Sequence, residues 1–207
     1  MGGGTSDAAA MIAALLAWHQ IDLSQVQRHE LVKASGILGA DVPVCLAFQL
    51  GLGSFFWLDG SGVGELPNAV GIESSLNLVL INPGVAVNTN MIFRALHSSD
   101  RSFTPGLSSQ PTITSVEDLI EFMSVTHNDL ESPARRVYSN IPDIPKAVTS
   151  LGFKTAFARQ SGSGATYFVL TETPEASQSL AQTLAQTYPD WWIKTGRSIR
   201  LCKHLVI

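Results

Sequence analysis

The sequence begins with a run of glycines that leads without a break into a strongly helical segment. Glycines occupy positions 2–4, residues 5–7 are Thr-Ser-Asp, and an alanine-rich, apolar stretch follows over residues 8–18. Glycine lets backbone N–H groups approach a ligand closely because it has no Cβ, and Thr, Ser and Asp all cap helices. A glycine loop that opens a helix directs unpaired N–H groups and the positive end of the helix dipole toward one point. This arrangement suits a phosphate, so the stretch is a candidate nucleotide phosphate loop.

A flexible tag or linker is the alternative interpretation of the same glycines. The run is not the P-loop motif, because no lysine follows it, and it lacks the spaced glycines of the dinucleotide-binding fingerprint. Two observations favour the phosphate loop over the linker. The glycines lead directly into a helical segment, and a second glycine loop lies at residues 161–165.

Composition narrows the class of protein. Of the 207 residues, 45% are hydrophobic and 14% are charged, which is a folded rather than a disordered profile. The net charge of −4 offers no basic surface for nucleic acid or for an anionic membrane. Cys45 and Cys202 lie far apart without histidine at ligand spacing, so we interpret them as reduced, buried thiols and predict no metal site. Because no basic leader or bilayer-spanning apolar run is present, we expect a soluble cytoplasmic protein without nucleic-acid or membrane partners.

Hydrophobic periodicity and turn residues divide the chain into helices and strands. The expected helices cover residues 8–19, 22–35, 88–96, 115–124, 128–138, 144–152 and 174–188. The expected strands lie within residues 45–58 and over residues 76–82, 154–159, 165–170 and 191–194. Residues 98–114, rich in Ser, Thr and Pro, are expected to form a mobile loop. The order of elements in the second half predicts an α+β fold, with an antiparallel sheet covered by helices on one face.

Two expectations concern the first half of the chain. The helix over residues 8–19 is apolar nearly all round, so we expect it to be buried. A glycine-marked turn over residues 36–45 presents a single acid, Asp41, shortly before Pro43. Because proline leaves the residue before it extended, we expect an extended bend here, with the Asp41 carboxylate aimed by it. Taken alone, Asp41 has an alternative role as a turn residue that caps the local backbone.

Five stretches of the sequence together resemble the GHMP kinases, the superfamily of galactokinase, homoserine kinase, mevalonate kinase and phosphomevalonate kinase. The stretches are GGGTSDAAA (2–10), LGADVP (38–43), NPG with VNTNMIF (82–84 and 87–93), NDLE (128–131) and QSGSGAT (160–166). Each is weak alone, but all occur in the order of the family and at comparable separations over nearly the whole chain. Within the superfamily, the likeness is to the kinases that act on 4-diphosphocytidyl-2-C-methyl-D-erythritol.

The resemblance implies a two-domain GHMP kinase-like fold, with the remainder of an N-terminal ATP-binding domain over residues 1–72 and a C-terminal domain over residues 73–207. It implies an ATP- and Mg²⁺-dependent enzyme that phosphorylates the 2-hydroxyl of the small-molecule substrate 4-diphosphocytidyl-2-C-methyl-D-erythritol, in non-mevalonate isoprenoid biosynthesis. The enzyme would be a monomer or a homodimer. Alternatives are a GHMP kinase for another alcohol and a catalytically inactive fragment that binds only a ligand or a protein.

The resemblance also implies roles for individual residues. Asp41 matches the catalytic acid beside the substrate hydroxyl. The residues matched to the ATP phosphates are Gly2, Gly3, Gly4, Thr5 and Ser6, and those matched to the substrate are Thr89, Phe93, Ser161 and Gly162. Phosphoryl transfer needs donors around the phosphates and an acid that orients or deprotonates the alcohol, so these residue types fit. The alternatives are a core position for Phe93, which matches a cytosine-stacking residue, and a plain β-turn over residues 161–165.

The sequence departs from the family at its start. The family has a longer N-terminal portion, which contains strands of the first domain and a lysine that pairs with the acid matched by Asp41. No lysine of this chain lies in a matching context, so that role is assigned to none of them. Met1 stands where the family has an apolar residue inside the glycine loop. We therefore hypothesise an N-terminally truncated version of a longer kinase, and we expect apolar surface to be exposed as a result.

Overall fold

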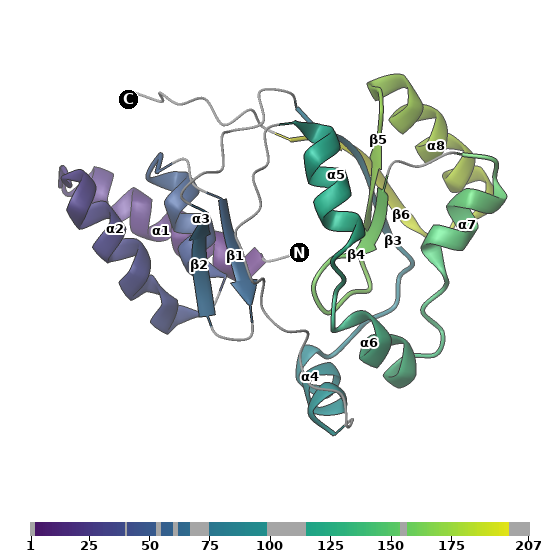
Figure 1. Cartoon of the computed structure of the whole chain (residues 1–207), viewed down its shortest axis with the longest axis horizontal. Helices are drawn as coiled ribbons and strands as arrows, with labels where there is room; N and C mark the ends of the chain where they lie inside the picture. The colour runs from purple at the N-terminus through teal and green to yellow at the C-terminus, as the bar shows by residue number, and fades with distance from the viewer. Residues whose placement is uncertain are drawn as a thin grey trace. The chain divides into compact units, whose positions relative to one another are not determined.

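The computed structural model describes residues 3–39, 41–52, 55–59, 62–66, 75–98, 115–153 and 157–198. These residues fall into two compact units (Figure 1). We call the described residues within 3–66 the N-terminal unit and those within 75–198 the C-terminal unit. The identification of these units with two family domains remains a prediction. Gly2, Cys202 and nearly all of the expected loop over residues 98–114 lie outside the described residues.

The N-terminal unit consists of helices and one antiparallel hairpin. The helices are α1 (Gly3–Trp18), α2 (Gln25–Ala34), the short 3-10 helix η1 (Ser35–Leu38) and α3 (Val42–Gln49), and the hairpin strands are β1 (Phe55–Asp59) and β2 (Gly62–Leu66). The buried core of this unit is Ala9, Val32, Leu46 and Ala47. Cys45 on α3 is a free, half-buried thiol.

Helix α2 begins where a capping motif in the sequence directs it to begin. The Ser24 hydroxyl accepts a hydrogen bond from the backbone N–H of Gln27 (3.4 Å), and the Ser24 N–H donates to the Gln27 side chain (2.9 Å). This reciprocal pair satisfies two backbone groups that the first turn of a helix otherwise leaves unpaired. Of the two expected starts for this helix, Asp22 and Ser24, the structure selects Ser24.

The expected burial of the first helix is wrong. Ala9 of α1 is fully buried against the core, but Met11 is 60% exposed, Leu15 49% and Trp18 83%. An apolar composition allows several faces of a helix to be buried. How many faces are in fact buried depends on how many other elements pack against the helix. Large apolar side chains are therefore exposed on α1.

The expected strand and extended bend after residue 40 are also wrong in part. Residues 45–49 belong to helix α3, and the strand β1 begins only at Phe55. Asp41 is helical in conformation (φ −87°, ψ −12°), and Pro43 lies in the first turn of α3. Proline is tolerated there because the N–H groups of a first turn have no partner within the helix. Pro43 therefore helps to start a helix here.

The C-terminal unit is built on a four-stranded antiparallel sheet with the order β4-β5-β3-β6. The strands are β3 (Asn77–Asn82), β4 (Phe157–Gln160), β5 (Tyr167–Thr171) and β6 (Trp192–Arg197). The helices are α4 (Thr89–His97), α5 (Val116–Ser124), α6 (Glu131–Val137), α7 (Ile144–Ser150) and α8 (Pro174–Thr187). The predicted α+β class and antiparallel sheet are confirmed (Figure 1).

One face of this sheet carries the core. Val79 and Ile81 of β3 alternate with half-buried residues, as the period of two in a strand requires. Ile81 lies opposite Tyr167 of β5 and Ile193 of β6. Helices α4, α6, α7 and α8 cover this face through buried apolar residues: Ile92, Ala134, Ile144, Val148, Leu180 and Leu184. No helix in the described part of the chain is long and apolar enough to cross a membrane.

Candidate functional site

The glycine stretch at the start of the chain is helical from Gly3 onward. Helix α1 includes Gly3, Gly4, Thr5 and Ser6 in its first turns, so the expected loop is, over these residues, the beginning of the helix itself. The alanine-rich segment that follows has the highest helix propensity and extends the helix back over the glycines, because propagation costs less than nucleation. The N–H groups of a first turn have no partner within the helix, so this turn retains donors of the kind that the phosphate interpretation requires.

The segment that leads to Asp41 packs against this same turn. A Cβ placed on Gly39 would lie 3.9 Å from the Thr5 methyl group and 3.7 Å from Val42, so the backbone passes close to α1. Gly39 has φ +150°, in the region that favours glycine. Within the N-terminal unit, the structure thus brings together two of the stretches that carry the family resemblance.

Asp41 is the residue that precedes α3, and its side chain is exposed. The carboxylate makes no capping hydrogen bond to the first turn of α3. The alternative role, in which Asp41 caps the local backbone, is therefore not the one that the structure adopts. The carboxylate is held at the start of a helix and faces solvent, where it can interact with a ligand.

The second glycine stretch forms a tight turn between β4 and β5. The N–H of Ser161 donates to the carbonyl oxygen of Thr166 (2.8 Å), and the N–H of Gly164 donates to that of Ser161 (3.0 Å). Gly162 (φ +54°) and Gly164 (φ +86°) adopt the left-handed conformation, which glycine enters at low cost. The turn geometry matches the plain β-turn alternative, but side chains from three other segments of the unit also contact this loop or the residue before it.

Thr89 is one of these contacts. It is the first residue of α4, and its hydroxyl lies 2.9 Å from the hydroxyl of Ser163. Asn88 caps the helix by accepting from the N–H of Met91 (3.3 Å). Two of the predicted substrate-binding segments are thus adjacent in the C-terminal unit, although their contact residues are 74 positions apart.

Phe93 is not part of the core, which was the alternative to its match with a cytosine-stacking residue. Ile92 is 0% and Leu96 5% exposed, whereas Phe93 is 38% exposed. Phe93 follows Thr89 by one helical turn, which places both on the same side of α4. The aromatic ring is therefore available at the surface on the side of the helix that carries Thr89.

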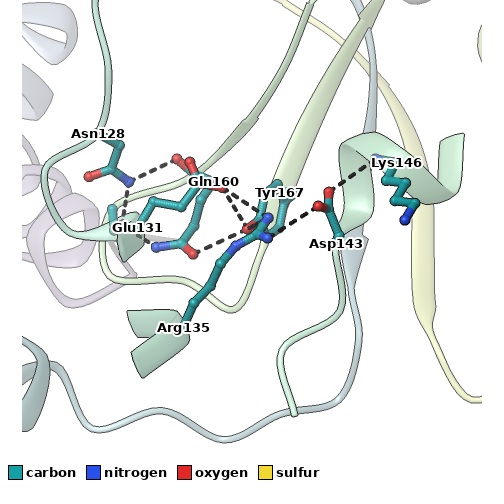
Figure 2. A network of polar contacts seen from close by, with 8 residues as sticks. Asn128, Glu131, Arg135, Asp143, Lys146, Gln160 and Tyr167 are labelled. Atoms are coloured by element: carbon teal, nitrogen blue, oxygen red, sulfur yellow. Dashed lines mark hydrogen bonds and ion pairs between the residues drawn. The ribbon is translucent and has the colours of Figure 1, made fainter. Parts of the chain in front are cut away.

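Asn128 contacts the glycine loop, and the sequence interpretation gave it no role. Its side-chain amide donates to the carbonyl oxygens of Gly162 (2.7 Å) and Gln160 (3.1 Å), as Figure 2 shows for Gln160. Its carbonyl oxygen accepts from the N–H of Leu130 (3.0 Å). The NDLE stretch identified Asn128 only as a residue at the start of a helix, because the contact partner lies far away in sequence.

A polar network surrounds the buried side chain of Tyr167, next to Gln160, the residue before the loop (Figure 2). The hydroxyl of Tyr167, a residue with no exposed surface, donates to Glu131 (2.9 Å) and accepts from Arg135 (3.1 Å). Arg135 also donates to Glu131 (3.2 Å). Burial raises the pKa of Tyr167 to about 12, so the phenol remains a neutral donor. Glu131 is the first residue of α6, and its contact with Tyr167 joins α6 to β5.

Asp143 closes the other end of this network. Its carboxylate accepts from the N–H of Lys146 (3.1 Å) and pairs with Arg135 (3.4 Å). The Lys146 backbone N–H, and then Arg135, lower the pKa of Asp143. The Nε atom of Arg135 is buried without a hydrogen-bond partner among the described residues. Arg135 therefore links α6, α7 and β5 through its terminal nitrogens.

A pocket of about 310 Å³ opens beside the loop, lined by Leu80, Asn82, Thr166 and Trp192. The Asn82 amide donates to the Thr166 hydroxyl (2.9 Å) and accepts from the N–H of Gly84 (2.8 Å). Asn82 and Trp192 are paired across β3 and β6. The pocket thus combines apolar walls with polar groups whose geometry is set by the NPG turn.

Residues 110–190 match the family described as "GHMP kinases C terminal". The chain belongs to the GHMP kinase superfamily. It is 36% identical over 200 residues to the 4-diphosphocytidyl-2-C-methyl-D-erythritol kinase of Mesorhizobium japonicum, covering 96% of this chain and 62% of that protein. It is also 36% identical over 193 residues to the enzyme of the same name from Dinoroseobacter shibae, covering 93% of this chain and 61% of that protein. This GHMP kinase chain therefore spans about three fifths of the length of these relatives.

Solved structures of GHMP kinases share the fold. A crystal structure of 4-(cytidine 5'-diphospho)-2C-methyl-D-erythritol kinase matches with a TM-score of 0.63 and 28% identity, over 94% of this chain and 65% of that chain. The structure of L. major mevalonate kinase in complex with R-mevalonate matches with a TM-score of 0.58 and 16% identity, over 94% of this chain and 65% of that chain. Because the sequence identity of the second match is only 16%, that match shows a shared fold and carries no argument about function. The resemblance predicted from five short stretches is confirmed at the level of the superfamily.

Proposed function

We propose that the protein carrying this chain is an ATP-dependent small-molecule kinase that phosphorylates the 2-hydroxyl of 4-diphosphocytidyl-2-C-methyl-D-erythritol. The observation that carries the proposal is the exposed Asp41 carboxylate, which does not cap α3 and belongs to a segment packed against the first turn of α1. The names of the relatives support the choice of substrate. The reaction would serve the non-mevalonate route to isoprenoid precursors.

In this proposal, the first turn of α1 binds the ATP phosphates. The residues are Gly2, Gly3, Gly4, Thr5 and Ser6, of which the last four lie in the described helix. Unpaired N–H groups and the helix dipole favour an anion at such a turn. A Cβ on Gly4 would meet no atom within 4 Å, so the backbone at this position is open to a ligand.

Asp41 is proposed to orient or deprotonate the substrate hydroxyl. An ionised carboxylate accepts a hydrogen bond from an alcohol, and this fixes the attacking oxygen in line with the γ-phosphoryl group. The described residues contain no group of three or more His, Cys, Asp or Glu side chains able to hold a metal ion. In the proposal, Mg²⁺ is held chiefly through the nucleotide phosphates and water, as is common for this ion, and it would neutralise phosphate charge.

The substrate is proposed to contact Thr89, Phe93, Ser161 and Gly162. The exposed ring of Phe93 offers an aromatic face on which a cytosine ring can stack. The hydroxyl of Thr89 and the Ser161–Gly164 turn supply hydrogen-bonding groups close to that helix. These groups suit the cytidylyl end of the substrate.

Replacement of Asp41 tests the proposal. In the natural polypeptide, Asp41→Asn should lower kcat by at least about 100-fold, because general-base catalysis contributes that much or more, while the affinity for ATP changes little. Asp22→Asn is the matched control, since Asp22 is 95% exposed and pairs only with Arg28 in the described structure. Unchanged turnover in Asp41→Asn would remove Asp41 from the mechanism.

A substrate screen separates the remaining functions. The natural polypeptide should phosphorylate 4-diphosphocytidyl-2-C-methyl-D-erythritol in preference to homoserine, mevalonate and galactose. Preference for one of the other alcohols would assign a different GHMP kinase activity. Absence of phosphoryl transfer to all four compounds, with nucleotide or substrate still bound, would identify a non-catalytic binding protein.

A further inference from the structure

We propose that Gln160 is a positioning residue, whose buried side-chain amide sets the conformation of the glycine loop over residues 161–164 and thereby the geometry of the substrate site. The functional part of this inference rests on the proposed kinase function. Gln160 is the last residue of β4 and is only 1% exposed. A buried amide destabilises the fold unless its donors and acceptor are used, so its contacts constrain its surroundings strongly.

The two ends of the Gln160 amide face groups of opposite character. Its Nε2 donates to the carbonyl oxygen of Gly162 (3.1 Å), and its Oε1 lies 3.4 Å from the hydroxyl of Tyr167. Arg135 can only donate, so the phenolic oxygen accepts from it and directs its single proton toward Glu131 (2.9 Å), with Gln160 Oε1 as the more distant second acceptor. A reversed amide would place one oxygen against the Gly162 carbonyl oxygen. The network in Figure 2 therefore selects one orientation of the Gln160 amide.

The glycine loop is shaped around this side chain. A Cβ on Gly164 would lie 2.9 Å from Cδ of Gln160, so only glycine leaves room for the amide. The Gly162 carbonyl oxygen accepts from a second amide, that of Asn128 (2.7 Å). Asn128 also donates to the backbone carbonyl oxygen of Gln160 (3.1 Å). Two side-chain amides from different segments thus converge on one loop carbonyl.

The conformation of the loop decides where its serines lie. Ser163 faces Thr89 at the start of α4, with 2.9 Å between the two hydroxyl oxygens. A shift of the Gly162 carbonyl would move Ser161 and Ser163 relative to Thr89. The Gln160 side chain is itself buried, so it does not contact a ligand directly. It acts on a ligand through the conformation of the loop.

The test combines a loop readout with a kinetic readout in the natural polypeptide. Gln160→Glu keeps the shape of the side chain but places an oxygen against the Gly162 carbonyl oxygen. We expect hydrogen exchange of the amides over residues 161–164 to accelerate about tenfold, which corresponds to the loss of one net hydrogen bond. We expect KM for the cytidylyl substrate to rise about tenfold, because the loss of one net hydrogen bond weakens substrate binding by about that factor. We expect kcat to stay within about twofold of wild type.

A second variant keeps the proposal falsifiable if Gln160→Glu fails to fold. Asn128→Asp retains the oxygen that accepts from the Leu130 N–H but loses the donor to Gly162. It should change loop exchange and KM in the same direction. Gln182→Glu, at an exposed position of α8, is the control for the added charge and should change neither readout.

The outcomes separate the two proposals. Lower thermal stability with wild-type loop exchange and wild-type KM in both variants would show a purely structural role and overturn the positioning inference. Faster loop exchange in both variants, without phosphoryl transfer by the wild-type protein, would support the positioning of the loop and count against the proposed function alone.

Discussion

The two units of the chain differ in how completely they bury their apolar residues. The C-terminal unit has a buried cluster drawn from β3, β5 and four helices, with Ile81, Tyr167 and Leu180 all at 0% exposure. The cluster of the N-terminal unit consists of Ala9, Val32, Leu46 and Ala47, while most of the large exposed apolar side chains among the described residues belong to this unit. Both units contain predicted site residues, so the candidate groups belong to units of unequal packing.

This difference bears on how each candidate group is held. Local stability follows the buried apolar contacts and protected hydrogen bonds of a region. The glycine loop of the C-terminal unit is anchored by hydrogen bonds from the Gln160 and Asn128 side chains. Asp41 follows a short 3-10 helix and precedes an eight-residue helix. We therefore expect the acid to be more mobile than the predicted substrate-binding loop.

Truncation of core leucines should produce the largest effect and tests the comparison directly. Leu180→Ala in α8 should lower the free energy of unfolding by about 2–5 kcal/mol, because it leaves a cavity in the larger cluster. Leu46→Ala in α3 should fall at the lower end of that range. Leu15→Ala, at a site 49% exposed, is the control and should cost much less. Urea unfolding monitored by hydrogen exchange measures the free energy of unfolding of each unit. Equal losses for the two core leucines would contradict the difference in packing between the units.

Substitution of Gly164 should have the next largest effect. Gly164→Ala combines a left-handed backbone (φ +86°) with a Cβ 2.9 Å from the Gln160 side chain. We expect a loss of about 1–3 kcal/mol in the free energy of unfolding of the C-terminal unit. Gly152→Ala has a similar φ (+81°) but no atom within 4 Å of the new Cβ, so it isolates the backbone contribution. Equal losses for both variants would show that Gln160 does not constrain the loop.

Removal of the α2 cap should have a moderate effect within the N-terminal unit. Ser24→Ala deletes the acceptor of the Gln27 N–H and half of the capping box, and should cost about 1 kcal/mol. Hydrogen exchange over residues 25–28 should accelerate, with little change over α8. Ser24→Asp, which keeps an acceptor, should retain most of the stability. Unchanged exchange in Ser24→Ala would mean that tertiary contacts, and not the cap, hold this helix start.

The smallest expected effect is a pH dependence of the free energy of unfolding. The pKa of Asp143 is lowered in the folded protein, so its contribution to stability is present above its ordinary pKa of about 3.9 and is lost as the pH falls through the lowered value. Because its side chain is 48% exposed, solvent screens the pair with Arg135. Asp143→Asn should therefore cost little at pH 6 and still less at pH 3. An equal cost at both pH values, measured by urea unfolding, would exclude the carboxylate charge as the cause.

Local patterns in the sequence predicted the C-terminal unit well. Asn88, Ser115 and Thr173 each cap the helix that follows them, and these caps place the starts of α4, α5 and α8 within a residue or two of expectation. The apolar run over residues 76–82 predicted the β3 strand. Such patterns act between residues that are close along the chain, and they form wherever the sequence places them.

The N-terminal unit was predicted less well, because its sequence is apolar without a clear period. Residues 45–49 were expected to be a strand and are helical, since a short apolar run does not distinguish the two structures. The exposure of α1 and the early start of that helix were also not predicted. In both cases the outcome depends on which surfaces find partners, and composition carries no information about that.

The family and most candidate residues were predicted from the resemblance of short motifs, and the α+β class from the order of the expected helices and strands, because motifs and periodicity are local properties of the chain. The assembly of the site depended on the fold. Asn128 donates to a carbonyl 32 positions away, and Thr89 meets Ser163 only because α4 begins beside the β4–β5 turn. Contacts of this kind are created when strands and helices pack, so they are visible only once the chain has folded.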